Sequence, residues 1–327
     1  LHIPIIGCAP NASHTPIFLL VGLWRGGPPS HLLFPLFLVA YVAAVLGNLM
    51  LVLLISRDSQ LSTPMYYLLR GLSVVDAGQA TVTLPQLLAH LASPQPVIPA
   101  AHCLTQFFFF YLFAVTDTLV VAVMALDRYV AICDPLHYSA LMNRHVCDCL
   151  MASCLILSLF HSLLHSALLL PLQWAGDNGG AVYIPHFFCD HWPLVRASCS
   201  NIQYNVLAIF LEGSLFVAGP CALILFSYAR IAAAIFHLHS AAGRWRAVST
   251  CSSHLTMVSF LYGTVIWVYF QPPSHNSPEQ DMAAAVMYTA ITPLANPFVY
   301  SFRNKNVKNA LHRLLSPSRV NSHLDWP

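Results

Sequence analysis

The sequence predicts an all-α membrane protein, built as a seven-transmembrane helix bundle with a short amphipathic helix near its C-terminal end. Two observations carry this prediction. The 327 residues are 57% hydrophobic and only 8% charged, with a mean hydropathy of +0.65, whereas a soluble domain carries about 25% charged residues. The apolar residues also gather into seven segments, each long enough to cross about 30 Å of hydrocarbon as a helix of about 20 residues.

The seven segments follow one another with short connections. They span roughly residues 31–56, 65–90, 104–126, 149–171, 204–228, 248–270 and 282–302. Helices are expected in all of them because a membrane segment must satisfy its backbone hydrogen bonds internally. The chain therefore divides into an extracellular N-terminus (1–30), a seven-helix domain (31–302) and a cytoplasmic tail (303–327).

The basic residues indicate the orientation of this bundle. With the N-terminus outside, eleven of the fourteen Arg and Lys residues lie on the cytoplasmic side, and only Arg25 and Arg196 lie outside. Such an excess is typical of cytoplasmic loops. The fourteenth, Arg70, lies near the inner end of the second segment and is expected to extend its side chain to the inner surface. The sequon Asn11-Ala12-Ser13 agrees with an extracellular N-terminus that is glycosylated at Asn11. No cleavable signal peptide is evident, so the first membrane helix is expected to serve as the insertion signal.

The C-terminal tail contains an amphipathic segment. Apolar residues recur there at helical spacing opposite a basic face, at Val307, Ala310, Leu311, Leu314 and Leu315. Helices with this pattern lie in the membrane interface, so a short helix is expected on the inner surface.

Ten cysteines fall into two groups by compartment. Cys8, Cys103, Cys189 and Cys199 would lie outside, where disulfides persist, and the other six would stay reduced. A Cys103–Cys189 bond would pin the long outer loop, about residues 172–203, over the bundle.

Two carboxylates are expected near the middle of the membrane. Asp76 follows Met65 by 11 residues on the second helix, and Asp117 precedes Arg128 by 11 residues on the third. At about 1.5 Å per residue, both lie about 16 Å from the cytoplasmic end. They would share a cation, or one would be protonated; two unrelated hydrogen-bonded acids remain the alternative.

Further polar residues and prolines suggest moving parts. Asn48 and Asn296 lie in the inner half of the bundle and would join Asp76 in a polar network. Because interhelical hydrogen bonds contribute only about 0.6–2 kcal/mol each, these three groups, with Asp117 as a fourth, favour a conformational role over adhesion. Three prolines can bend the fifth and seventh helices, at Pro220, Pro293 and Pro297.

Polar groups also occur in the outer part of the fourth and fifth helices. Glu212 is either a water-accessible rim residue or the polar anchor of a ligand pocket. His161 and His165 are spaced i, i+4 on the fourth helix. Because the sequence shows no third ligand, packing is favoured over metal binding.

The stretch from Met124 to Tyr138 places the pair Asp127-Arg128 at the end of an apolar segment. Charges there are costly unless they are solvated or paired. Arg128 is either an interfacial anchor or a switch that bonds Asp127 in one state and other groups in a second.

Several motifs occur in order along nearly the whole chain. They are Leu46-Gly47-Asn48, Pro64-Met65-Tyr66-Tyr67-Leu68, Leu72-Ser73-x-x-Asp76, the 124–138 block, His186-Phe187-Phe188-Cys189-Asp190, Ser227-Tyr228-x-x-Ile231, Ser249-Thr250-Cys251-Ser252-Ser253-His254-Leu255 and Pro293-Leu294-Ala295-Asn296-Pro297-Phe298-Val299-Tyr300. Through them the chain resembles the rhodopsin-like G-protein-coupled receptors, specifically the tetrapod-type subgroup of the olfactory (odorant) receptors.

The resemblance implies a receptor, not an enzyme. It would bind small volatile molecules in an outer pocket and activate a stimulatory, olfactory-type heterotrimeric G protein, which raises cyclic AMP. It would sit among lipids in the plasma membrane of sensory cilia, without nucleic acid as a partner. The only cofactor expected is an allosteric sodium ion.

The resemblance also implies roles for particular residues. By position, the ligand pocket would contain Phe110, Tyr111, Ala114, Val115, Glu212, Phe216, Tyr262, Val265, Tyr269 and Thr289. Activation and G-protein coupling would involve Asp127, Arg128, Tyr129, Tyr228, Asn296, Pro297 and Tyr300. The sodium site would be lined by Asp76 and Asp117.

Four features depart from the family pattern. Leu126 replaces a tyrosine, Asp117 a glutamate and Ala295 a leucine. The outer loop also lacks the cysteine that normally pairs with the one corresponding to Cys199. Cys199 is therefore free or pairs with Cys8, and Cys199→Ser is expected to leave surface expression nearly unchanged.

Two other classes of function stay open on the sequence alone. One is a rhodopsin-like receptor for a peptide, amine or lipid, although Phe110 and Tyr111 stand where an amine would need an acid. The other is a channel or transporter, suggested only by Asp76 and Asp117. The lack of internal repeats and of paired broken segments weighs against it.

Overall fold

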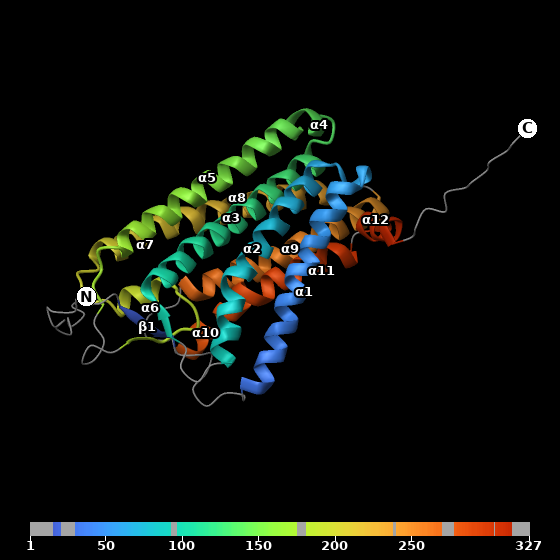
Figure 1. Cartoon of the computed structure of the whole chain (residues 1–327). Coiled ribbons are helices and arrows are strands. Elements are labelled where there is room, and N and C mark those ends of the chain that lie inside the picture. The colour runs from blue at the N-terminus through green and yellow to red at the C-terminus, as the bar shows by residue number, and fades with distance from the viewer. Residues whose placement is uncertain are drawn as a thin grey trace, which may run out of the picture.

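A computed structural model describes residues 16–20, 30–92, 97–174, 181–237, 240–269, 278–303 and 305–315. Long helices run side by side in one bundle, with small elements at its two ends (Figure 1). We call one end the sheet end, because it carries β1 (Ile17–Leu20), β2 (Val97–Pro99) and β3 (Val182–Ile184). The opposite end is the α12 end, named after α12 (Lys305–Leu315).

Seven helical passes make the bundle, as the sequence predicts. The first four are α1 (Ser30–Arg57), α2 (Pro64–Ala92), α3 (Ala100–Cys133) and α5 (Arg144–Leu169). The fifth runs through α7 (Gln203–Gly213), η3 (Ser214–Ala218) and α8 (Gly219–Phe236), and the sixth is α9 (Ala241–Tyr269). The seventh runs through α10 (Pro278–Val286), η4 (Met287–Ile291) and α11 (Thr292–Arg303). The predicted fold class is confirmed.

The passes differ in how apolar they are. Within the described residues, five are long and apolar enough to qualify as membrane spans by composition alone, and α2 and α9 are not among them. On α2 the polar residues Asp76, Gln79 and Thr83 point inward and are buried. Large apolar side chains instead remain exposed on the outside of the bundle, where lipid would cover them; examples are Leu36, Val39, Phe160, Phe210 and Leu225.

The third pass lies at the centre of the packing. α3 packs against α2, α5, α8 and α9, whereas α1 packs against α2 and α11. The buried apolar residues form one large cluster toward the sheet end and a second toward the α12 end. Gly47 on α1 permits a close approach, because a Cβ atom there would lie 3.0 Å from the Pro297 ring on α11.

Prolines distort the fifth and seventh passes as expected. Pro220 is the second residue after the wide π-helical turn η3, and Pro293 is the second residue after the similar turn η4. A proline lacks the N–H that would bond to the carbonyl four residues earlier, and its ring collides with that carbonyl. The wide turns absorb both problems, and they are the local distortion that each pass shows.

A small sheet covers one end of the bundle and was not predicted. β1 lies between β2 and β3, antiparallel to β2 and parallel to β3. Cys103 and Cys189 form the expected disulfide, with Cα atoms 5.5 Å apart. Phe187, Phe188 and Cys189 are fully buried, so the outer loop is packed into the bundle.

The remaining cysteines divide largely as expected. The six assigned to the membrane or cytosol are free thiols. Cys199 is disulfide-bonded, and its partner lies outside the described residues. The alternative of a free Cys199 is therefore wrong. The predicted glycosylation position, Asn11, also lies outside the described residues.

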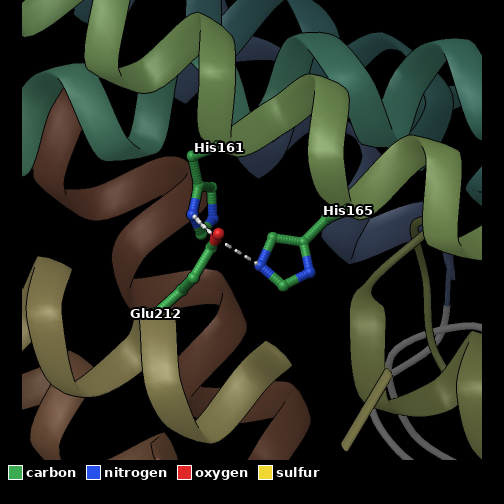
Figure 2. Close-up of side chains that lie close together, drawn as sticks. All are labelled: His161, His165 and Glu212. Carbon is green, nitrogen blue, oxygen red and sulfur yellow. Dashed lines mark ion pairs between the residues drawn. The ribbon is translucent and has the colours of Figure 1, made fainter. Parts of the chain in front are cut away.

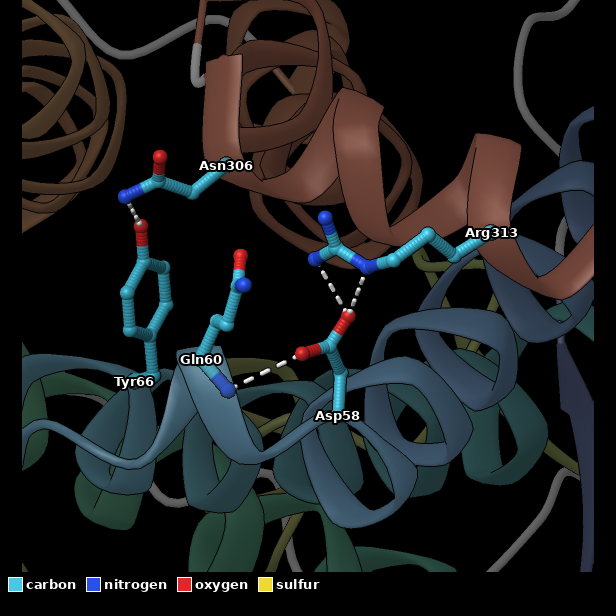
Figure 3. Close-up of polar contacts among 5 residues, drawn as sticks. All are labelled: Asp58, Gln60, Tyr66, Asn306 and Arg313. Carbon is cyan, nitrogen blue, oxygen red and sulfur yellow. Dashed lines mark hydrogen bonds and ion pairs between the residues drawn. The ribbon is translucent and has the colours of Figure 1, made fainter.

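The amphipathic helix α12 packs back against the bundle. Val307 and Ala310 are buried in the cluster at this end. Arg313 donates two hydrogen bonds to Asp58 Oδ2, of 3.0 Å from Nε and 2.5 Å from Nη2 (Figure 3). Asp58 also caps η1 (Ser59–Leu61) by accepting a hydrogen bond of 2.9 Å from the Gln60 amide.

Candidate ligand and switch sites

Some of the predicted pocket residues gather around His161 on α5. The ring of Phe216 from η3 lies 5.0 Å from the His161 ring, and that of Tyr111 from α3 lies 6.0 Å away, between centroids. Glu212 from α7 places its Oε2 atom 2.8 Å from His161 Nδ1. Three separate passes thus bring aromatic and polar side chains to one place toward the sheet end.

The outer loop supplies the next layer of this region. The Phe110 ring lies 4.9 Å from Phe188 and 5.9 Å from Tyr288. Tyr111 donates a 2.7 Å hydrogen bond to Asp190 Oδ1, and Tyr288 donates a 3.4 Å bond to Asp190 Oδ2. Asp190 therefore ties the loop to two passes of the bundle.

Asp190 also begins a short helix in the loop. Its carboxylate caps α6 (His191–Arg196) by accepting a 2.8 Å hydrogen bond from the His191 amide. Burial, together with the nearby His165 and His161, holds the pKa of His191 well below its ordinary value. His191 is therefore a neutral imidazole at neutral pH.

The other predicted pocket residues lie deeper or apart. Tyr262 and Val265 pack in the cluster toward the α12 end, and the Tyr262 hydroxyl donates a 3.0 Å hydrogen bond to Thr118 O on α3. Thr289 is fully buried and bonds to its own helix, at Ala285 O. Ala114 packs against the sheet-end cluster, and Val115 is buried. The Tyr269 side chain lies outside the described part of the structure.

Polar side chains meet in the middle of the bundle. Asn296 Nδ2 donates a 2.6 Å hydrogen bond to Asp76 Oδ2, and Asn48 Nδ2 donates a 2.9 Å bond to Pro293 O. Asp117 is close enough to Asp76 for their charges to repel. Four side-chain oxygens in this region are buried without a hydrogen-bond partner in the described structure: the Oδ1 atoms of Asn48, Asp76, Asp117 and Asn296.

Asp127 and Arg128 do not form an ion pair with each other in the described part of this structure. Asp127 Oδ1 accepts a 2.7 Å hydrogen bond from Tyr138, in the short helix α4 (Tyr138–Leu141). The neighbouring Tyr129 ring lies 5.8 Å from Phe226 on α8.

A relay of two hydrogen bonds joins three passes nearby. The Tyr228 hydroxyl lies 2.7 Å from His254 Nδ1, and His254 Nε2 lies 3.0 Å from Val121 O. Because a carbonyl oxygen only accepts, Nε2 carries the proton and Nδ1 accepts from Tyr228. α8, α9 and α3 are thereby held together. Tyr300 on α11 is buried in the apolar cluster toward the α12 end, against which Tyr228 also packs. Its hydroxyl has no hydrogen-bond partner within the described structure.

Comparison with known proteins decides the family. A sequence model of the olfactory receptors matches residues 37–318. This chain belongs to the olfactory receptor family. The receptor is 67% identical to human olfactory receptor 1B1 over 312 residues, which cover 95% of this chain and 98% of that protein.

More distant relatives are olfactory receptors as well. The receptor is 44% identical to rat olfactory receptor 1468 over 303 residues, which cover 93% of this chain and 95% of that protein. It is also 44% identical to mouse olfactory receptor 1E16 over 309 residues, which cover 94% of this chain and 96% of that protein. The family consists of odorant-sensing G-protein-coupled receptors and not enzymes, so the recognition from sequence motifs is confirmed.

Several residues that shape these sites in the receptor were not assigned from the sequence. Asp190 and Tyr288 hold the outer loop, and Tyr138 holds Asp127. His254 lies inside a motif that was noted, but its two partners lie on other passes. Glu212 is the third group beside His161 and His165 that the sequence did not show.

The receptor also has a pocket of about 560 Å³ at the α12 end. Three arginines line it, Arg57, Arg70 and Arg144, together with Tyr67 and Tyr138. It lies at the opposite end from the His161 region, and its basic lining does not suit a small apolar ligand.

Proposed function

We propose that this receptor binds small, volatile, largely apolar odorants near His161, and that binding activates a stimulatory, olfactory-type G protein that raises cyclic AMP. One relationship carries the proposal. Tyr262 and His254 lie eight residues apart on α9, or about 12 Å along the helix axis, and both bond to the backbone of α3. Tyr262 lies deeper in the bundle than His161, so a ligand that reaches from the His161 region to Tyr262 and displaces it would also loosen the relay at His254.

Activation would be an outward movement of α9 at the α12 end. That movement must break the bond from His254 to Val121 O, and it would free Tyr228 to bond elsewhere. Arg128 and Tyr129 would be exposed to the G protein, with Asp127 held by Tyr138. Asn296, Pro297 and Tyr300 would form the moving end of α11. The odorant can shift this equilibrium only by its difference in affinity between the two states.

The chemistry of the proposed pocket favours apolar ligands. Phe110, Tyr111 and Phe216 offer ring faces, and Ala114 and Val115 lie on the same helix as the first two. Glu212 faces two imidazoles, so it is less available to a cationic ligand than the sequence suggested. Apolar pockets separate ligands that differ by one methylene by only about 1–3 kcal/mol, so many related odorants would bind.

The orientation is proposed with the sheet end outside. The Cys103–Cys189 disulfide lies at that end, and disulfides persist in the extracellular compartment. Three arginines line the pocket at the α12 end, as expected for the cytoplasmic side. The N-terminus with Asn11 would then be extracellular and the tail cytoplasmic, in the plasma membrane of sensory cilia.

We also propose an allosteric sodium ion between Asp76 and Asp117. Carboxylate and amide oxygens are the ligands of hard cations, and four such oxygens are unpaired here. A cation would also offset the repulsion between the two carboxylates.

The proposed function is tested by measuring cyclic AMP in cells that express the receptor and an olfactory-type G protein, across a broad odorant panel. A dose-dependent response that is lost in Arg128→Ala at equal surface level is expected. A response that persists without the G protein, or an odorant-driven current in its absence, would contradict the proposal and favour a channel.

A further inference from the structure

A cluster of two histidines and one glutamate joins α5 to α7. His161 and His165 lie one helical turn apart, and both aim a ring nitrogen at the same carboxylate oxygen (Figure 2). The distances to Glu212 Oε2 are 2.8 Å from His161 Nδ1 and 3.0 Å from His165 Nε2. Both histidines are buried.

The histidine ring nitrogens and the Glu212 oxygen are close together, but their geometry is poor for hydrogen bonding. Glu212 Oε2 and His161 Nδ1 are both buried, and neither makes a hydrogen bond of acceptable angle within the described structure. Burying polar atoms without hydrogen-bond partners costs free energy, unless a further group binds to them. A cation between them would satisfy all three side chains at once.

We propose that His161, His165 and Glu212 form a binding site for a divalent transition-metal ion, with Zn²⁺ as the best match. The three ligand atoms lie within 4.8 Å of one another. Tetrahedral ligands at about 2.0–2.2 Å from Zn²⁺ lie about 3.4 Å apart, so only small side-chain rotations are needed. Two imidazoles and one carboxylate are a common zinc donor set, which leaves a fourth position open.

The surroundings of the cluster fit this assignment. The His191 ring lies 4.6 Å from that of His165, and its Nε2 is buried without a hydrogen-bond partner among the described residues. His191 is not one of the three residues whose ligand atoms lie within 4.8 Å of one another, so it contributes to the surroundings and not to the ligand set. The rings of Tyr111 and Phe216 flank His161, so the metal would lie in an enclosed, largely apolar region.

The proposed metal would fasten the fourth pass to the fifth. Resting on the proposed function, it would also change the odorant response, because the same side chains line the proposed pocket. Metal binding itself requires neither odorant nor G protein, so it can be measured even if the proposed function fails.

The test titrates metal-stripped receptor in lipid nanodiscs with Zn²⁺ against a fluorescent chelator, without odorant. One tight site is expected in the wild type, weakened about 100-fold or more in His161→Ala, His165→Ala and Glu212→Gln. His102→Ala, which removes an exposed histidine on α3, is the matched control and should bind as the wild type does.

Two results would overturn the site. One is equal zinc affinity in the wild type and all three variants. The other is a loss of thermal stability in these variants without any zinc binding by the wild type, which would show a purely structural cluster. If the variants do not fold, X-ray absorption of the zinc-loaded wild type decides: a shell with two imidazoles supports the site, and a shell without them refutes it.

Discussion

Asn296 on α11 donates a 2.6 Å hydrogen bond to Asp76 on α2, which joins residues 220 positions apart in the middle of the bundle. The bond satisfies only one oxygen of the carboxylate. Asp76 Oδ1 is left without a hydrogen bond in the described structure, as is Asp117 Oδ1 across from it. The centre of the bundle thus holds two buried carboxyl oxygens without hydrogen-bond partners among the described residues, and a cation bound there would act on the position of α11.

Removal of sodium is expected to destabilise the receptor. A ligand at ten times its Kd stabilises the state it binds by about 1.4 kcal/mol, so replacing sodium with choline should lower the Tm of the purified receptor. Asp117→Asn removes one of the two charges and should abolish this sodium dependence. An equal effect of choline on the wild type and the variant would rule out a sodium site at these residues.

Loss of His254 is expected to raise signalling without odorant. His254→Ala removes the relay from Tyr228 to Val121 O, and a buried hydrogen-bonding group that loses its partner costs about 1–3 kcal/mol. Basal cyclic AMP per receptor at the surface should rise at least about fivefold, because 1 kcal/mol changes a ratio of states by about that factor. Tyr228→Phe breaks one of the two bonds and should give an intermediate rise. Unchanged basal signalling in His254→Ala would show that the relay does not hold the resting state.

The Asp58–Arg313 ion pair is expected to make the thermal stability of the receptor depend on pH. The Arg313 guanidinium, followed by the Gln60 amide, holds the pKa of Asp58 below its ordinary value of 3.8. A lowered carboxyl pKa stabilises the folded state above the ordinary value, and this contribution is lost as the pH falls through the lowered pKa. The Tm of Asp58→Asn should therefore be a few degrees below that of the wild type at pH 7, and the gap should close in strong acid. Because the pair is partly exposed, high salt should shrink the gap as well. A gap that is constant with pH would refute the role of the ion pair.

Cys199→Ser is expected to reduce surface expression several-fold. Cys199 is disulfide-bonded, although the sequence left this open and favoured no effect. Loss of a native disulfide typically costs about 2–5 kcal/mol. Cys103→Ser should have a larger effect, since its bond to Cys189 holds the buried part of the outer loop. Cys149→Ser, at an exposed free thiol, is the control. Wild-type expression of Cys199→Ser would show that this bond is dispensable.

The sequence by itself determined the architecture of this protein. Seven apolar segments of this length are expected to form helices in lipid, and prolines within them predict local distortions, which occur as the π-helical turns η3 and η4. The order of the motifs, from Leu46 to Tyr300, was enough to identify the family. These features are local, because each depends on residues within one helix or one short segment.

The tertiary structure alone decided which polar groups meet. Nothing near Glu212 in the sequence points to His161, and nothing near Tyr228 points to His254; each partner lies on another pass, and the rotation of each helix fixes the contact. The sheet at the sheet end was missed for a similar reason. Its three strands are three or four residues long, too short to show a period, and they pair across segments that are far apart in the sequence. The membrane helices can be predicted from hydrophobicity alone, whereas the polar sites depend on how the helices pack against one another.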